Sequence, residues 1–170
     1  MDTLECLLTR RSIRKYSDKP IPESLIEELI RYAMYAPSAK NTRPWHFVVI
    51  NRREILDSII DFHPYAKMLL QAPCAIAVCG DENEANTPEY WPVDCSIASQ
   101  NLLLAAHAKE LGAVWLGIYP RQERMNELSG LLGLPSHIHP LSLISLGYPE
   151  QEVSKIPERF EPAKIHFNKF

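Results

Sequence analysis

A run of cationic side chains near the N-terminus has the composition of an anion-binding site. Arg10-Arg11-Ser12-Ile13-Arg14-Lys15-Tyr16 combines three arginines with a serine hydroxyl. Guanidinium groups form forked, charge-assisted hydrogen bonds with phosphate, and a serine hydroxyl can add another. The helix predicted before this run presents its C-terminus here, so its dipole does not help to attract an anion. The pattern indicates a phosphate site, although a solvated basic loop would have the same composition.

Three further segments have features suited to ligand binding. The loop Ala36-Pro37-Ser38-Ala39-Lys40-Asn41-Thr42-Arg43-Pro44-Trp45 is stiffened by proline at both ends, and its Asn41 offers a donor and an acceptor. Leu111-Gly112-Ala113-Val114-Trp115-Leu116-Gly117 enters a strand whose last glycine lets a ligand approach a backbone N–H. Arg159 lies in a proline-bounded part of the tail. Taken singly, these could be a rigid loop, a strand end and a solvated arginine.

Several common catalytic and phosphate-binding motifs are missing from the sequence. Neither G-x-G-x-x-G, G-x-x-x-x-G-K-[ST] nor G-x-S-x-G occurs, and no C-x-x-C pair is present among the 4 cysteines. His137 and His139 alternate and could form a metal pair on a strand, but no third ligand is apparent. We favour surface histidines before Pro140 and expect no metal site. A phosphorylated cofactor would therefore have to be held by side-chain charge.

Composition indicates an ordinary soluble domain. The 170 residues are 46% hydrophobic and 23% charged, with a formal net charge of −3, so we expect one domain over 1–170. Nothing in the overall charge favours nucleic acid. No apolar run is long enough to span a membrane, and no secretory segment is recognisable, so we expect a cytoplasmic protein.

Hydrophobic periodicity and capping signals predict helices alternating with short strands. The helices are expected at 2–9, 22–36, 52–62, 94–111 and 120–133, and the strands at 46–50, 74–79, 113–118 and 141–146. Asp94 is expected to cap the long fourth helix, which is apolar nearly all round and so is buried either within the domain or at a dimer interface. Strands separated by helices predict a sheet covered on both faces, in a three-layer α/β/α sandwich.

Together these segments resemble the nitroreductase family of FMN-dependent oxidoreductases. The RRSIRKY and APSAKNTRPW segments are quite specific to that family, and LGAVWLG, the LGYP turn and the tail ERFEPAKIHFNKF fit one of its shorter branches. The resemblance extends over nearly the whole chain in the same order. It implies an α+β fold with a central mixed, largely antiparallel sheet. It also implies a homodimer whose exchanged C-terminal tails embrace the partner, with two FMN sites at the interface.

The resemblance also implies a role for each segment. The basic run would hold the FMN phosphate, the ribityl chain and the pyrimidine side of the flavin, and the tail arginine would return to the phosphate. The proline-bounded loop would come from the other subunit, and the strand end would lie along the isoalloxazine with a backbone N–H near N5. The implied cofactor-binding residues are Arg10, Arg11, Ser12, Arg14, Pro37, Ser38, Ala39, Asn41, Leu116, Gly117 and Arg159.

The implied activity needs no catalytic side chain, because the cofactor performs the chemistry. We expect hydride transfer from NAD(P)H through flavin N5 to a small acceptor such as a quinone or nitroaromatic, with ping-pong kinetics. A metabolite-specific flavin dehydrogenase, an FMN carrier or sensor without turnover, and a phosphate-binding protein without flavin remain alternatives. The sequence leaves open the physiological acceptor and the choice between NADH and NADPH.

The sequence also leaves two possibilities for how the flavin pocket is closed. The segment 81–93 is short where relatives often have a longer insertion, so the pocket is either more open or closed by Tyr90 and Trp91. Ordinary packing is the alternative for Trp91. Arg43 is either a surface substitution or a bias toward anionic substrates. His63 and Tyr65 are further candidates for the pocket.

Overall fold

The computed structural model of this chain describes residues 1–85, 87–151 and 156–170. Four strands pair in the order β1-β2-β4-β3. The strands are β1 (Trp45–Ile50), β2 (Cys74–Asp81), β3 (Gly112–Gly117) and β4 (Ile138–Gly147). The α-helices are α1 (Thr3–Thr9), α2 (Glu23–Ala33), α3 (Arg53–Phe62), α4 (Trp91–Ala108) and α5 (Gln122–Leu132). Most of the predicted elements are therefore present, with bounds that shift by a few residues.

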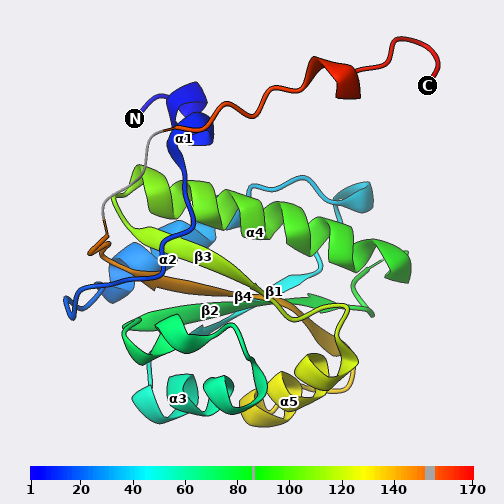
Figure 1. Ribbon diagram of the computed structural model, residues 1–170. Coiled ribbons are helices and arrows are strands. Elements are labelled where there is room, and N and C mark those ends of the chain that lie inside the picture. The colour runs from blue at the N-terminus through cyan, green and yellow to red at the C-terminus, as the bar shows by residue number, and fades with distance from the viewer. Residues whose placement is uncertain (86, 152–155) are drawn as a thin grey trace.

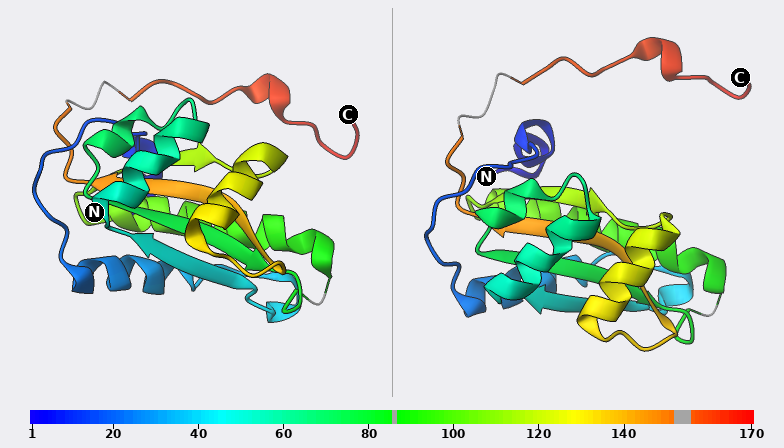
Figure 2. Two further views of the ribbon diagram at one scale, coloured as in Figure 1. Left: turned by 90° about the horizontal axis from the view of Figure 1, so that it is seen from below. Right: turned by 60° about the horizontal axis from the view of Figure 1, so that its bottom comes forward.

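The sheet lies between two layers of helices. Helix α4 packs on one face and has α2 beside it, while α3 and α5 cover the other face (Figures 1 and 2). This confirms the α+β class and the three-layer arrangement. All three strand pairs are antiparallel, so the sheet formed by the described residues is not mixed as predicted. The parallel component is an isolated bridge between Ser12 and Ala113.

Continuous apolar sequence explains the position of the central strands. Every residue of β2 is buried, as expected for a strand that has a neighbour on each side and helices on both faces. Gly80 in β2 lies directly under Trp91, because a Cβ at Gly80 would stand 2.6 Å from the indole ring. Trp91 also stacks on His139, with ring centroids 5.5 Å apart. Trp91 therefore packs α4 onto the sheet. This supports ordinary packing, and not closure of the flavin pocket, as the role of Trp91.

Helix α4 begins earlier than predicted. It starts at Trp91 and accommodates Pro92 in its first turn, where a missing N–H has no cost. Asp94 consequently lies inside the helix and does not cap it, which corrects the prediction. The helix ends at Ala108, before the predicted 111, because Glu110 takes a left-handed backbone conformation with φ 62° and Gly112 already begins β3.

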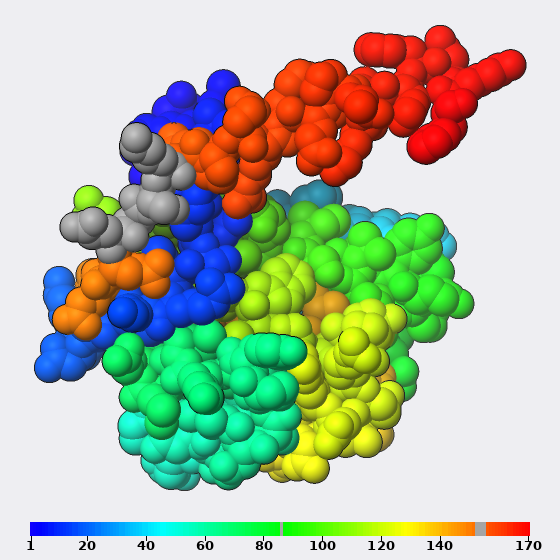
Figure 3. Space-filling view, viewed as in Figure 1, coloured from blue at the N-terminus to red at the C-terminus, as the bar shows by residue number. Residues whose placement is uncertain are grey.

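The C-terminal arm, residues 156–170, leaves the body of the molecule after passing near α1 (Figures 1 and 3). Its aromatic side chains are exposed, with relative exposures of 69% for Phe160 and 85% for Phe167. Residue 86, in the segment 81–93, and residues 152–155, before the arm, lie outside the described residues. In the described part of the chain, no helix combines the length and the apolar character that crossing a bilayer requires.

Candidate functional site

The basic segment lies along the outer edge of β3. Ser12 bridges to Ala113, and the N–H of Ile13 donates to the carbonyl oxygen of Ala113 at 3.0 Å. The Ile13 side chain fills the space above Gly112, where a Cβ would stand 2.5 Å from it. These contacts hold the flanking arginines next to the start of the strand.

Three arginines of the predicted site approach one another without a balancing carboxylate. The pKa of Arg10 lies below its ordinary value because of burial and then because of the positive charges of Arg11 and Arg159. Within the described ranges, none of these three, nor Arg14, forms an ion pair with a carboxylate. Clustered cations of this kind are stabilised by an anion. The tail arginine is therefore close enough to the basic run for its charge to act on Arg10.

The arginines of the basic run differ in how many of their side-chain donors are available to a ligand. Arg11 donates through Nη1 to the carbonyl oxygens of Leu8 and Arg10, both at 2.7 Å, so it partly serves the end of α1. Its Nε is buried and has no hydrogen-bond partner among the described residues. Arg14 has an exposed side chain, and its backbone N–H donates to Oε1 of Gln151 at 2.9 Å. An anion bound beside Arg11 would give its unpaired Nε a hydrogen-bond partner.

Tyr16 anchors the end of the basic run to the sheet. Its hydroxyl donates to the carbonyl oxygen of Ile13 at 2.6 Å and lies 2.6 Å from Oγ of Ser145. Burial raises the pKa of Tyr16 to about 12. Its ring occupies the space that a side chain at Gly147 would need, since a Cβ there would be 2.7 Å from the ring. Tyr16 therefore has a structural role and keeps the run in place.

Gly117 ends β3 at the same edge. In an antiparallel strand, residues two apart direct their backbone groups to the same side, so Gly117 shares the outer edge with Ala113. The two residues are about 13 Å apart along the strand. A Cβ at Gly117 would meet no atom within 4 Å. The sheet face above this glycine is therefore open, while the side chain of Leu116 points into the core.

Two side chains hold the carbonyl of Gly117. Nε2 of His63 lies 3.1 Å from this oxygen, and Arg124 donates to it through Nη1 at 2.8 Å. The pKa of His63 lies below its ordinary value, mainly because the ring is buried and also because Arg124 is close. Neutral His63 then donates from Nε2 and accepts the N–H of Tyr65 at Nδ1, 3.3 Å away. Arg124 was not predicted, because its place on α5 carries no local signal.

The proline-bounded loop has an unusual backbone that the rest of the protein holds in place. Lys40, Asn41 and Arg43 all have positive φ, between 52° and 57°. Such conformations are costly for residues other than glycine and asparagine and persist where surrounding contacts impose them. The N–H of Ala39 donates to Oδ1 of Asp94 at 2.9 Å, and the N–H of Arg43 donates to Oγ of Ser38 at 2.9 Å. These hydrogen bonds therefore hold the loop in one backbone conformation.

Within one chain, this loop and the basic run lie at opposite ends of α4. Asp94, near the start of the helix, contacts the loop, whereas His107, near its end, lies 2.8 Å from Oγ1 of Thr9 beside the basic run. The separation of 13 positions between Asp94 and His107 corresponds to about 20 Å of helix. The structure therefore brings together 10–14, 116–117 and Arg159, but leaves 37–41 outside that group.

Two remaining pocket candidates lie elsewhere. Arg43 lines a separate cleft of about 550 Å³ together with Met34, Thr42, Trp45 and Glu84. Tyr90 is exposed beside the buried Trp91. The guanidinium of Arg124 lies 5.7 Å from the ring centre of Tyr65, so Tyr65 and His63 both border Gly117. Of these candidates, only His63 and Tyr65 lie at the strand edge.

The fold and site define a class of α+β protein with an arginine-rich segment and a partly exposed glycine on one strand edge. A model of the nitroreductase family matches residues 7–148. A protein of Methanothermobacter thermautotrophicus, assigned as an NADH dehydrogenase/NAD(P)H nitroreductase, is 48% identical over 170 residues, which is 100% of this chain and 88% of the relative. The chain belongs to the nitroreductase family of oxidoreductases.

Solved structures are similar throughout their length. A crystal structure from Parabacteroides distasonis, with the same assignment, has a TM-score of 0.94 and 43% identity, covering 99% of this chain and 98% of that one. A protein from Desulfovibrio desulfuricans, assigned as a nitroreductase and solved in complex with FMN, has a TM-score of 0.84 and 29% identity, covering 100% of this chain and 99% of that one. The fold is thus that of the family.

Proposed function

We propose that this protein is an FMN-dependent oxidoreductase that uses NAD(P)H. The observation that carries the proposal is the outer edge of β3, where unbalanced arginines lie at one end and a partly exposed glycine at the other. The separation of about 13 Å suits an elongated ligand with a phosphate at one end and a flat ring at the other. Relatives assigned as NAD(P)H nitroreductases, and one solved with FMN, support the choice of cofactor and donor.

Different residues of the chain would bind different parts of FMN. Arg10 and Arg159, with Ser12, would hold the phosphate, and Nε of Arg11 would gain its missing partner. Arg14 would place positive charge near the pyrimidine side of the ring. The N–H of Gly117 would face the ring, while His63 and Arg124 hold the carbonyl of the same residue. When bound, FMN would accept hydride from NAD(P)H at N5 and pass it to a quinone or nitroaromatic, which predicts ping-pong kinetics.

The site also requires a second copy of the chain. The loop 37–41 lies about 20 Å from the basic run along α4. If two copies pack with their α4 helices antiparallel, the loop of one copy reaches the basic run of the other. The face available for this contact is apolar, since Leu4 is 68% exposed, Tyr35 81% and Val93 52%. We therefore infer a homodimer in which the loop residues Pro37, Ser38, Ala39 and Asn41 complete the partner's site.

An absorption spectrum of the purified protein tests this function first. The protein should show flavin bands, release FMN on denaturation, and bleach on anaerobic addition of NADH or NADPH; the more effective donor is then the preferred one. Adding a quinone or a nitroaromatic should restore the bands. Bands that never bleach would support a carrier or sensor, and a single effective metabolite would support a specific dehydrogenase. A colourless protein that does not take up added FMN would overturn the proposal.

A further inference from the structure

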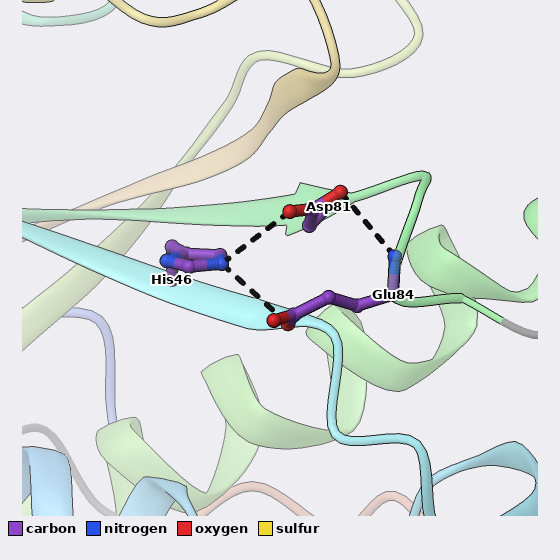
Figure 4. Close-up of side chains that lie close together, drawn as sticks. All are labelled: His46, Asp81 and Glu84. Carbon is purple, nitrogen blue, oxygen red and sulfur yellow. Dashed lines mark hydrogen bonds and ion pairs between the residues drawn. The ribbon is translucent and has the colours of Figure 1, made fainter.

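Carboxylates and imidazoles converge at the edge of the sheet opposite to β3. His46 is in β1, Asp81 ends β2, and Glu84 follows in the turn after β2 (Figure 4). One ligand atom from each of the three lies within 4.8 Å of the others. In the strand order β1-β2-β4-β3, this group lies at the opposite edge from Gly117, so it is distinct from the proposed flavin site.

Asp81 is the buried centre of the group. Its side chain is only 10% exposed. Its Oδ1 accepts the backbone N–H groups of Asn83 at 2.7 Å and Glu84 at 3.4 Å, which fixes the direction of the carboxylate. Its Oδ2 receives no hydrogen bond from any described residue but lies 3.8 Å from Nε2 of His46 and 3.8 Å from Nε2 of His137. An oxygen of this mostly buried side chain is thus aimed at two imidazole nitrogens that stand beyond hydrogen-bond distance.

The spacing is that of ligands around a small cation. Nitrogen and oxygen ligands at about 2.0–2.1 Å from Zn²⁺ are about 3.3 Å apart in a tetrahedral site. Here Nε2 of His46 lies 3.6 Å from Oε2 of Glu84 and 3.8 Å from Oδ2 of Asp81. A contraction of a few tenths of an ångström would bring each of these two separations to that of ligands on one ion, and the oxygens of Asp81 and Glu84 lie within 4.8 Å of each other.

We propose that His46, Asp81 and Glu84 bind a divalent transition-metal ion of the Zn²⁺ type. Imidazole and carboxylate ligands suit Zn²⁺, and the set neutralises its charge with two carboxylates. This group gives no local spacing signal in the sequence, because His46 lies far along the chain from Asp81 and Glu84. The less favoured alternative of a His137 and His139 metal pair is not supported, since His139 instead pairs with Glu82 at 2.9 Å.

The ion would fasten the turn after β2 to the strand that follows the proline-bounded loop. The N–H of Asp81 already donates to the carbonyl oxygen of Pro44 at 2.8 Å, and the N–H of Glu82 donates to that of His137 at 3.0 Å. A metal bound by side chains at the same place would strengthen these backbone links. The role is structural, so it does not depend on the proposed redox activity.

Calorimetric titration of the chelator-treated, full-length protein with ZnCl₂ tests the site. We expect one ion per chain and a rise of the unfolding midpoint of about 5–10 °C at a hundredfold excess over Kd. Co²⁺ should give the visible absorption bands of a tetrahedral complex. Glu84→Gln, an exposed position that folding does not depend on, and His46→Ala should each weaken Zn²⁺ binding at least tenfold, and Asp81→Asn, which keeps the Oδ1 acceptor, should do the same.

Glu82→Gln is the matched control, because this neighbouring carboxylate is paired with His139 outside the group. It should leave the Zn²⁺ affinity unchanged. Absence of binding heat and of thermal stabilisation up to millimolar ZnCl₂ would overturn the proposal. So would an affinity that survives Asp81→Asn and Glu84→Gln but is lost in Glu82→Gln. Because Zn²⁺ binding is measured without a redox assay, its failure is distinct from failure of the flavin function.

Discussion

Arg124 donates a 2.8 Å hydrogen bond from Nη1 to the carbonyl oxygen of Gly117, so a side chain of α5 fixes the end of β3. His63, from the segment after α3, approaches the same oxygen. Both of these side chains approach from the same face of the sheet, and they leave the backbone N–H of Gly117 at the open edge. The position of this glycine therefore depends on Arg124, which is close in the chain, and on His63, which lies 54 positions away.

His63 should make stability depend on pH. Its pKa is lowered in the folded protein, so on acidification the unfolded chain takes up the proton first. The stabilising contribution is complete above the ordinary value of about 6.5 and is lost as the pH falls below it. In urea unfolding between pH 7.5 and 5, His63→Gln should show a shallower decline than the wild type. His107, whose pKa is also lowered, remains in both proteins; equal slopes would contradict the role of His63.

Gly117→Val should leave the fold intact and block the proposed cofactor site. No atom of the chain lies within 4 Å of an added Cβ, so the unfolding midpoint should change by less than about 2 °C, as for a neutral surface substitution. FMN retention after gel filtration should fall sharply, because the valine would occupy the space at the strand edge. A variant that keeps FMN at full occupancy would remove Gly117 from the site.

Arg14→Ala should weaken FMN binding by about 1.5–3 kcal/mol, the scale of a hydrogen bond to a charged group. Fluorescence titration of the apoprotein measures this as a rise in Kd of roughly tenfold to hundredfold. Lys15→Ala is the control, since Lys15 is the exposed neighbour that carries the same charge. An equal effect of both variants would indicate a general electrostatic contribution and not a specific contact of Arg14.

Asp94→Ala should destabilise the loop before β1. The variant loses the acceptor for the N–H of Ala39, which should lower the free energy of unfolding by about 1.5–3 kcal/mol. Asp94→Asn keeps an oxygen at that place and removes a buried charge whose Oδ2 has no partner among the described residues, so its cost should be smaller. Chemical denaturation of both variants compares them; an equal cost would show that charge, not the hydrogen bond, matters.

Truncation after Tyr148 should disrupt both assembly and cofactor binding. It removes Arg159 and the exposed aromatic side chains of the arm, which have little contact with their own chain. Light scattering should report a weaker dimer, and the absorption spectrum a lower flavin content. Arg159→Ala in the full chain is the comparison: it should lose FMN affinity while it stays dimeric. A truncated protein that is dimeric and fully loaded with flavin would contradict the exchanged-tail arrangement.

The local patterns of the sequence determined most of the elements and the identity of the family. Apolar runs such as 74–79 allow only a buried strand, and the arginines at 10–14 retain their charge in any fold. Local patterns also suggested a cap at Asp94, but this residue forms a tertiary contact with Ala39 instead. Helix start signals compete with such contacts, and here the earlier first turn with Pro92 prevails.

Only the tertiary structure decided which of these residues meet. Strand register places the basic run and Gly117 on one edge, while the length of α4 separates the loop 37–41 from them. Helix packing brings Arg124 to Gly117, and strand pairing brings His46 to Asp81. The physical reason is that these contacts join residues of different helices and strands, so they follow from the packing of whole elements and leave no periodic signal in the chain.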